Sequence, residues 1–168
     1  MKAVRIVRHP LMSLLFVAVP SAFSSSADAQ ARTTSADASV RILPAASAEQ
    51  VTPLDFGRVL PSGQGGILTM APDGAIQCTG GLRCDSRGTP GLFKLSGADD
   101  LITVSVSPSV TLAGPGGESI ALQPLLSLSE IRLNGGTGAL QVGGVLTLAA
   151  GQAPGRYAGT YIIDLQYQ

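Results

Sequence analysis

Two cysteines, Cys78 and Cys84, carry the most definite chemistry in this chain. A cysteine pair can form a structural disulfide, exchange electrons in a redox site, or bind zinc with further ligands. Redox pairs usually have two residues between the cysteines and an activating neighbour, whereas five residues separate these two. A zinc site needs more ligands, and the single histidine, His9, lies near the N-terminus. We therefore expect a disulfide that closes a small loop, worth about 2.4 kcal/mol in the chain-entropy model.

Three short motifs suggest catalysis or ligand binding, but each is incomplete. Asp55-Phe56-Gly57 matches the metal-binding triplet of protein kinases, yet the Gly-rich loop, strand lysine and catalytic-loop motif are missing. Asp99-Asp100 has no EF-hand loop around it. Asn134-Gly135-Gly136-Thr137-Gly138 has no Lys-Ser/Thr after it, as a phosphate loop requires. We expect all three motifs to form turns.

The other routes to catalysis are also poorly supplied. Serine triads need a histidine, and the only histidine falls in the segment that we expect to be removed. Paired-carboxylate hydrolysis stays open in principle, but no pattern selects which acids would act. We expect a protein that is not an enzyme, with no catalytic, cofactor-binding or metal-binding residues and no cofactor.

The N-terminus has the pattern of an export signal. Basic residues at 2, 5 and 8 precede an apolar run over 11–19, and Ala27-Asp28-Ala29 follows. This order is typical of a secretory signal peptide, and the run is far shorter than the ~20 residues that span a bilayer. We predict cleavage after Ala29 and residence in the periplasm, at the cell surface or outside the cell. Export would favour pairing of the two cysteines.

Cleavage changes the charge of the chain. It removes three of the 11 basic and one of the 11 acidic side chains, which leaves 139 of 168 residues and a formal charge of −2. So few basic residues argue against a nucleic-acid partner. A hydrophobic share of 45% argues against wholesale disorder. We expect a flexible lead-in over 30–38, one domain over 39–168, and no transmembrane span.

The expected domain consists of short β-like runs between glycine, proline and asparagine clusters. Turn chemistry is clearest at Gly114-Pro115-Gly116-Gly117 and Asn134-Gly135-Gly136. The runs predict strands over 39–43, 66–70, 75–78, 92–95, 101–106, 110–113, 128–133, 144–149 and 156–167. Many short strands at close spacing indicate an all-β sandwich or barrel.

The last predicted strand alternates most cleanly. Tyr157, Tyr161, Ile163, Leu165 and Tyr167 point one way, and Ala158, Thr160, Asp164 and Gln166 point the other. All three tyrosines of the chain therefore fall on one face. Core and cross-strand packing explains such a face, and an exposed strand edge for a partner is the alternative.

Two segments resemble a known family. The tail Ala149-Ala150-Gly151-Gln152-Ala153-Pro154-Gly155-Arg156-Tyr157-Ala158-Gly159-Thr160-Tyr161, marked by its Gly159-Thr160-Tyr161 triplet, and Leu54-Asp55-Phe56-Gly57-Arg58-Val59 upstream resemble a secreted bacterial domain of unknown function, DUF4402. The resemblance covers roughly residues 39–168. That family has no established activity, so the resemblance implies a secreted β-sandwich and little more.

The tail is more loosely similar to fimbrial subunits of the chaperone–usher type and to spore-coat-U-like proteins. Tyr167 is penultimate and Gly155 is fourteenth from the end, as in many such subunits. Their last strand forms the edge of an incomplete immunoglobulin-like sandwich. A chaperone strand first completes this sandwich, and the N-terminal strand of the next subunit then replaces it. The resemblance implies an assembly edge made of Gly155, Tyr157, Gly159, Thr160, Tyr161, Ile163, Leu165 and Tyr167, with Ala38, Val40 and Ile42 as a modest donor strand.

Two features depart from the fimbrial pattern. The cysteines lie close together in sequence, whereas fimbrial subunits bridge distant ones, and the N-terminal lead has few large apolar residues. We expect an immunoglobulin-like antiparallel β-sandwich that acts as a secreted surface or fimbria-like structural subunit and associates by strand-edge addition. A periplasmic chaperone or like subunits would be its partners. The alternative is a secreted binding module, an adhesin for glycan or protein, with an exposed aromatic or polar cluster at the loop ends.

Overall fold

The computed structural model describes residues 34–61, 63–85 and 87–168. The predicted signal peptide over 1–29 and the first residues of the lead-in lie outside the described residues. The chain divides into two units, Met1–Ser39 and Val40–Gln168. Of the first unit, residues 34–39 are described as exposed and without regular secondary structure. None of the helices in the described residues is long and apolar enough to cross a membrane.

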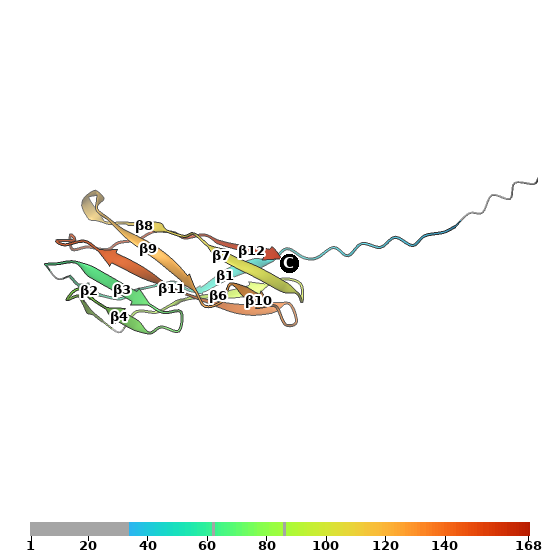
Figure 1. Ribbon diagram of the computed structural model, residues 1–168, viewed down its shortest axis with the longest axis horizontal. Helices are drawn as coiled ribbons and strands as arrows, with labels where there is room; N and C mark the ends of the chain where they lie inside the picture. Colours follow the sequence, from blue (N-terminus) through green and yellow to red (C-terminus); the bar gives the residue numbers. More distant parts are fainter. Residues whose placement is uncertain (1–33, 62, 86) are drawn as a thin grey trace, which may run out of the picture. The chain divides into compact units, whose positions relative to one another are not determined.

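The second unit is built from β-strands, with one short 3-10 turn, η1 (Pro115–Gly117). The strands are β1 (Ser47–Thr52), β2 (Val59–Leu60), β3 (Gly66–Met70), β4 (Ile76–Cys78), β5 (Arg83–Cys84), β6 (Gly91–Ser96), β7 (Leu101–Val106), β8 (Val110–Ala113), β9 (Ser119–Leu126), β10 (Glu130–Arg132), β11 (Thr137–Leu148) and β12 (Ile163–Tyr167) (Figure 1). All their pairings are antiparallel. The expected all-β, immunoglobulin-like antiparallel sandwich is confirmed.

The long strand β11 lies at the centre of the largest of the three sheets, where it pairs with three other strands. Its first half, residues 137–142, pairs with β6, and residues 144–148 pair with β3. β9 pairs with residues 142–147, so the seven-stranded sheet continues through β1, β4 and β8 at its margins. β10, β7 and β12 form a second sheet of three strands, and β2 and β5 form a two-stranded ribbon (Figure 1).

The buried side chains form two clusters, which share β11. We call one the closed half: Phe56, Leu68, Met70, Leu82, Leu112, Ile120, Leu122, Leu146 and Leu148. We call the other the open half: Phe93, Leu95, Ile102, Val104, Ile131, Leu133, Leu140 and Val142. The open half lies between the seven-stranded and three-stranded sheets. The closed half lies on the seven-stranded sheet, and residues of the β2–β5 ribbon, Val59 and Cys84, pack against it.

Two glycines mark the point where β11 passes from one half to the other. A Cβ on Gly143 would collide with the carbonyl oxygen of Met70 and lie 2.7 Å from the carbonyl carbon of Ala71. A Cβ on Gly144 would lie 2.6 Å from Leu122 Cδ1. The strand can change partner here because its backbone approaches its neighbours closely, which a side chain would prevent.

The structure confirms most of the predicted strands, including 66–70, 101–106 and 110–113 as whole strands. The strand predicted over 39–43 is wrong, because those residues have no strand partner, and β1 is the first strand in the described part of the chain. β1 carries no clear signal because its core-facing positions, Ala48 and Gln50, are small or polar. The predicted strand over 156–167 is too long, since only β12 pairs with β7 as a ladder.

The local pattern does not predict β9, because Pro124 interrupts the alternation of apolar and polar residues there. The N–H of Gly114 donates a hydrogen bond to the carbonyl of Glu118. The backbone N–H and C=O groups of even-numbered residues in β9 therefore point toward β8. β8 pairs with β9 only between Ser119 and Leu122. The missing N–H of Pro124 therefore faces a side without a partner strand, where proline is tolerated.

Candidate functional site

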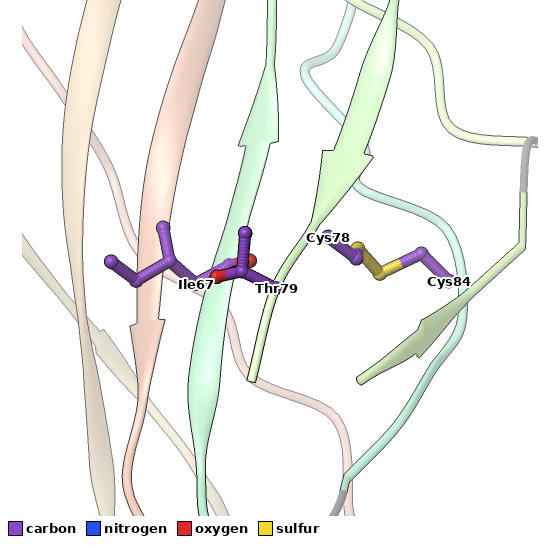
Figure 2. The surroundings of a disulfide bond; sticks show 4 residues. All are labelled: Ile67, Cys78, Thr79 and Cys84. Carbon is purple, nitrogen blue, oxygen red and sulfur yellow. A yellow bond between two sulfur atoms is a disulfide. The ribbon is translucent and has the colours of Figure 1, made fainter. Parts of the chain in front are cut away.

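The predicted disulfide is present. It joins Cys78, the last residue of β4, to Cys84, the last residue of β5 (Figure 2). The adjacent Thr79 bonds back to β3, because its N–H donates to the carbonyl of Ile67 at 2.9 Å. The disulfide therefore ties the β2–β5 ribbon to the seven-stranded sheet. This is a structural role in the closed half.

The three motifs that mimic ligand sites are turns, as expected. The Asp55 carboxylate accepts the N–H of Gly57 at 2.9 Å, and the Asp100 carboxylate accepts the N–H of Leu101 at 2.8 Å. Gly135 and Gly136, with φ of 61° and 74°, form a two-residue hairpin loop. The described residues contain no group of three or more His, Cys, Asp or Glu placed to hold a metal ion.

Tyr157 belongs to the closed half. Its hydroxyl donates to the carbonyl of Ala153 at 2.8 Å and accepts from the side-chain amide of Gln152 at 2.8 Å. A tyrosine bonded to the backbone a few residues upstream, at the corner before a late strand, is a feature of immunoglobulin-like sandwiches. Tyr157 therefore fixes the connection between β11 and β12, and Gly155 lies inside that corner.

β12 is an edge strand with free backbone groups. The carbonyl of Ile162 accepts from Ser107, and the N–H of Gln168 donates to Leu101. The backbone N–H and C=O groups of the even-numbered residues therefore point toward β7, and those of Ile163, Leu165 and Tyr167 point away from it. In the described part of the chain, β12 pairs with β7 alone.

β1 is the facing edge. The N–H of Gly97 donates to the carbonyl of Gly136. The backbone N–H and C=O groups of odd-numbered residues in β6 therefore point toward β11, and those of even-numbered residues point toward β1. The register then turns the backbone groups of Ala48 and Gln50 away from β6. Their side chains share the face of their partners Leu95 and Phe93, which are buried, and yet Ala48 and Gln50 are exposed. The sandwich therefore stays uncovered over β1.

The two edges bound a hollow of about 420 Å³, which we call the β1–β12 groove. Among the described residues, those that line it are uncharged: Ala48, Gln50, Pro53, Leu54, Phe93, Gly159, Thr160, Tyr161 and Ile163. An uncharged groove beside an unpaired strand edge can accept an extended chain, because such a chain forms backbone hydrogen bonds with the free edge.

Tyr161 forms part of the groove wall. Its ring meets that of Phe93 edge to face, with centroids 6.1 Å apart. Its hydroxyl is buried against Gly91 and has no hydrogen-bond partner among the described residues. Burial raises the pKa of this hydroxyl above its ordinary value of 10.0, because the anion would lose its hydration.

Tyr167, the last residue of β12, packs against the open half. Its hydroxyl accepts the N–H of Ala98 at 2.7 Å and donates to the carbonyl of Pro44 at 2.9 Å. Gly97 leaves the room that this hydroxyl needs, since a Cβ there would collide with it. Tyr167 thus ties the chain just before β1 to the loop after β6.

The residues predicted for an assembly edge divide between two places. Gly159, Thr160, Tyr161 and Ile163 line the groove, and Leu165 and Tyr167 pack against the open half beside it. Gly155 and Tyr157 lie elsewhere, in the corner of the closed half, because the chain is not one continuous strand from 156 to 167. The predicted donor residues Val40 and Ile42 are 86% and 87% exposed, and Ala38 is exposed too.

Sequence reasoning missed the other wall of the groove. Ala48, Gln50, Pro53, Leu54 and Phe93 line it, and no motif marks them. The alternation of Phe93 and Leu95 was visible in the sequence, but it predicts burial on any sheet face. Only the pairing of β1 with β6 places these residues opposite the tail.

The match to known proteins covers this domain. The family model described as Domain of unknown function (DUF4402) matches residues 46–167. The chain belongs to this family. The match runs from the residue before β1 to the last residue of β12, so both groove edges lie inside the DUF4402 domain. The searches of curated proteins and of solved structures found no match.

Proposed function

We propose that this DUF4402 protein is a non-enzymatic, secreted, fimbria-like structural subunit that associates by adding a β-strand to its β1–β12 groove. The single observation behind the proposal is that the free backbone edges of β1 and β12 face one uncharged groove. One inserted strand would extend the sheet at β12 and cover the exposed inner face of β1. A periplasmic chaperone or a like subunit would supply it.

The N-terminal segment has the chemistry of such a strand. Ala38, Val40 and Ile42 alternate with polar or charged residues over 37–42, so an extended chain over these residues would present its apolar side chains on one face. Val40 and Ile42 are almost fully exposed, which leaves their apolar area unburied in the single chain. Burying two such side chains in a groove would contribute roughly 1.5–3 kcal/mol each.

A binding experiment tests the proposal. A chain with Val40→Asp and Ile42→Asp cannot supply its own apolar strand, so its groove stays free for a labelled peptide of residues 34–44. We expect fluorescence anisotropy to show saturable binding, and the peptide carrying the same two substitutions to lose it. If the unchanged peptide does not bind, strand addition at this groove is wrong.

Neighbouring residues provide a matched control in the protein. Ile163→Asp places a charge in the groove wall, whereas Ile162→Asp places it on the neighbouring residue, which is 63% exposed. We expect the first change to abolish peptide binding and the second to leave it. Equal effects of both would show that the peptide binds elsewhere.

The absence of enzymatic activity and the export of the chain are tested separately. Broad ester and glycoside substrate panels should show no turnover by the purified protein. Mass measurement of the mature protein recovered from the host's periplasm or medium should give a chain that begins at Gln30. A full-length cytoplasmic chain would contradict export.

A second candidate, a binding module, is favoured by a polar hollow on the outer face of the ribbon. It measures about 460 Å³ and is lined in part by Arg58, Arg83 and Asp85. Arg58 lies opposite Asp85 in the ladder, so both arginines share a face with that carboxylate. Guanidinium groups in a pair suit acidic sugars. A glycan array would test this, with Arg83→Gln expected to remove any acidic hit and Arg132→Gln, on β10, expected to keep it.

A further inference from the structure

We propose that Pro44 and Tyr167 keep the N-terminal segment of a chain out of its own β1–β12 groove and so leave it available to a second copy of the chain. The inference rests on the proposed strand addition and adds where the strand comes from. A chain that holds both a groove and a matching segment could otherwise fill its own groove and end any assembly.

The path back into a chain's own groove is short. Pro44 is bonded to Tyr167, near the start of β1, while Pro53 and Leu54, just after β1, line the groove with Thr160 and Tyr161. β1 and β12 therefore run in opposite directions. The segment before β1 could enter its own groove only by turning back along β1 in a tight hairpin at residues 43–46.

The sequence at this turn opposes both short hairpin loops. A two-residue loop at Pro44-Ala45 needs a positive φ at its first residue, and the proline ring holds φ near −65°. A three-residue loop over 43–45 would place Pro44 at the third position of a type I turn, where proline is disfavoured. It would also require a left-handed conformation at Ala45, which a Cβ penalises.

The contacts around the turn oppose it as well. The Pro44 carbonyl accepts from the Tyr167 hydroxyl, which is itself held by Ala98. Ala46, the residue before β1, packs against the open half, and this contact holds the chain there in place. A longer loop that started earlier would draw Ile42 out of the groove. Val40 and Ile42, which precede Pro44, accordingly lie in solvent.

The test builds the missing hairpin. Pro44→Asn with Ala45→Gly creates the Asn-Gly pair that favours a two-residue loop. We expect this variant to be monomeric by light scattering and to melt at a higher temperature than the Val40→Asp, Ile42→Asp chain. We also expect it to bind the labelled 34–44 peptide at least about 100-fold more weakly than that chain, because a tethered strand competes at a millimolar effective concentration.

Three further variants keep the result interpretable. Adding Val40→Asp and Ile42→Asp to the hairpin variant should restore peptide binding, which also shows that the hairpin variant is folded. Pro44→Ala removes the ring without supplying a positive φ. Tyr167→Phe removes both hydroxyl bonds. We expect each of these two changes to raise the monomer fraction less than the Asn-Gly pair does.

The outcomes separate this inference from the proposed function. A hairpin variant that binds peptide as well as the Val40→Asp, Ile42→Asp chain would show that the turn is not limiting, and would overturn the inference. A wild-type chain that is monomeric and refuses peptide until Val40 and Ile42 are changed would show self-filling, and would overturn it too. If the Val40→Asp, Ile42→Asp chain itself binds no peptide, the proposed function fails.

Discussion

The closed half and the open half use the same face of the same sheet, but different elements cover them. Residues of the β2–β5 ribbon and Tyr157 pack against the closed half. The disulfide ties the ribbon to β4, and the Tyr157 hydroxyl both donates and accepts a hydrogen bond. Over the open half lies a three-stranded sheet that ends at β12 and leaves β1 uncovered. The cover of the closed half is held by the disulfide and by the Tyr157 hydrogen bonds, whereas the cover of the open half leaves a groove between β1 and β12.

The difference is visible at single residues. Leu68 and Met70, core-facing on β3 in the closed half, are fully buried. Ile163 and Leu165, core-facing on β12, are only partly buried, and Ala48 on β1 is exposed. The open half also has fully buried side chains, including Leu95 and Leu140, so it has a core of its own and can keep a groove at its margin without unfolding the domain.

The largest expected effect lies where the halves meet. In Gly143→Ala the new Cβ would strike the backbone of Met70 and Ala71, which cannot move without loosening the β11–β3 pairing. We expect a loss of about 3 kcal/mol in the free energy of unfolding, from overpacking. Gly63→Ala is the control, because its Cβ would meet nothing within 4 Å. Equal urea midpoints for the two variants would contradict the close approach.

Removal of the disulfide should weaken the closed half alone. Cys78→Ser with Cys84→Ser opens a seven-residue ring, which should lower the free energy of unfolding by about 2 kcal/mol. Peptide affinity at the β1–β12 groove should not change under conditions where the domain stays folded. A parallel loss of peptide affinity would mean that the two halves are coupled.

Tyr157→Phe measures the corner of the closed half. The change removes one hydrogen bond to Ala153 and one from Gln152. A cost of about 1 to 2 kcal/mol in the free energy of unfolding by urea is expected, since each of the two hydrogen bonds contributes roughly 0.5–1 kcal/mol. An unchanged stability would show that the corner is not a stabilising contact.

Tyr161→Phe is the matching change in the open half, and its expected effect is the smallest. The hydroxyl has no partner among the described residues, so its removal should leave stability unchanged or raise it by up to about 1 kcal/mol. A clear loss of stability would reveal a partner for this hydroxyl. Tyr157→Phe and Tyr161→Phe therefore compare the effect of losing one tyrosine hydroxyl on the free energy of unfolding in the two halves.

The same tyrosine gives the open half a pH dependence. Burial raises the pKa of Tyr161 above 10.0, so the unfolded chain loses this proton first as pH rises. Stability from this group is present in full below pH 10 and falls as pH rises through the folded pKa. The wild-type melting temperature should therefore drop more steeply above pH 10 than that of Tyr161→Phe. Parallel curves would contradict the burial of the hydroxyl.

Much of the fold could be predicted from local pattern. β3, β7 and β8 are regular runs bounded by turn residues, and the spacing of Cys78 and Cys84 indicated a disulfide that is present. β1 and β9 could not be found in this way. The core-facing positions of β1 are small or polar, and Pro124 in β9 is tolerated only because β8 has already ended beside it.

The sequence by itself determined that the chain is all-β, that its cysteines pair, and that its last residues alternate, because strand periodicity and turn chemistry are local properties. Only the tertiary structure decided what the alternation serves. It divided the three tyrosines among a corner, a groove wall and a latch on Pro44, and it placed β1 opposite β12. Which strand edges remain unpaired depends on contacts between residues far apart in the chain, and no local pattern records that.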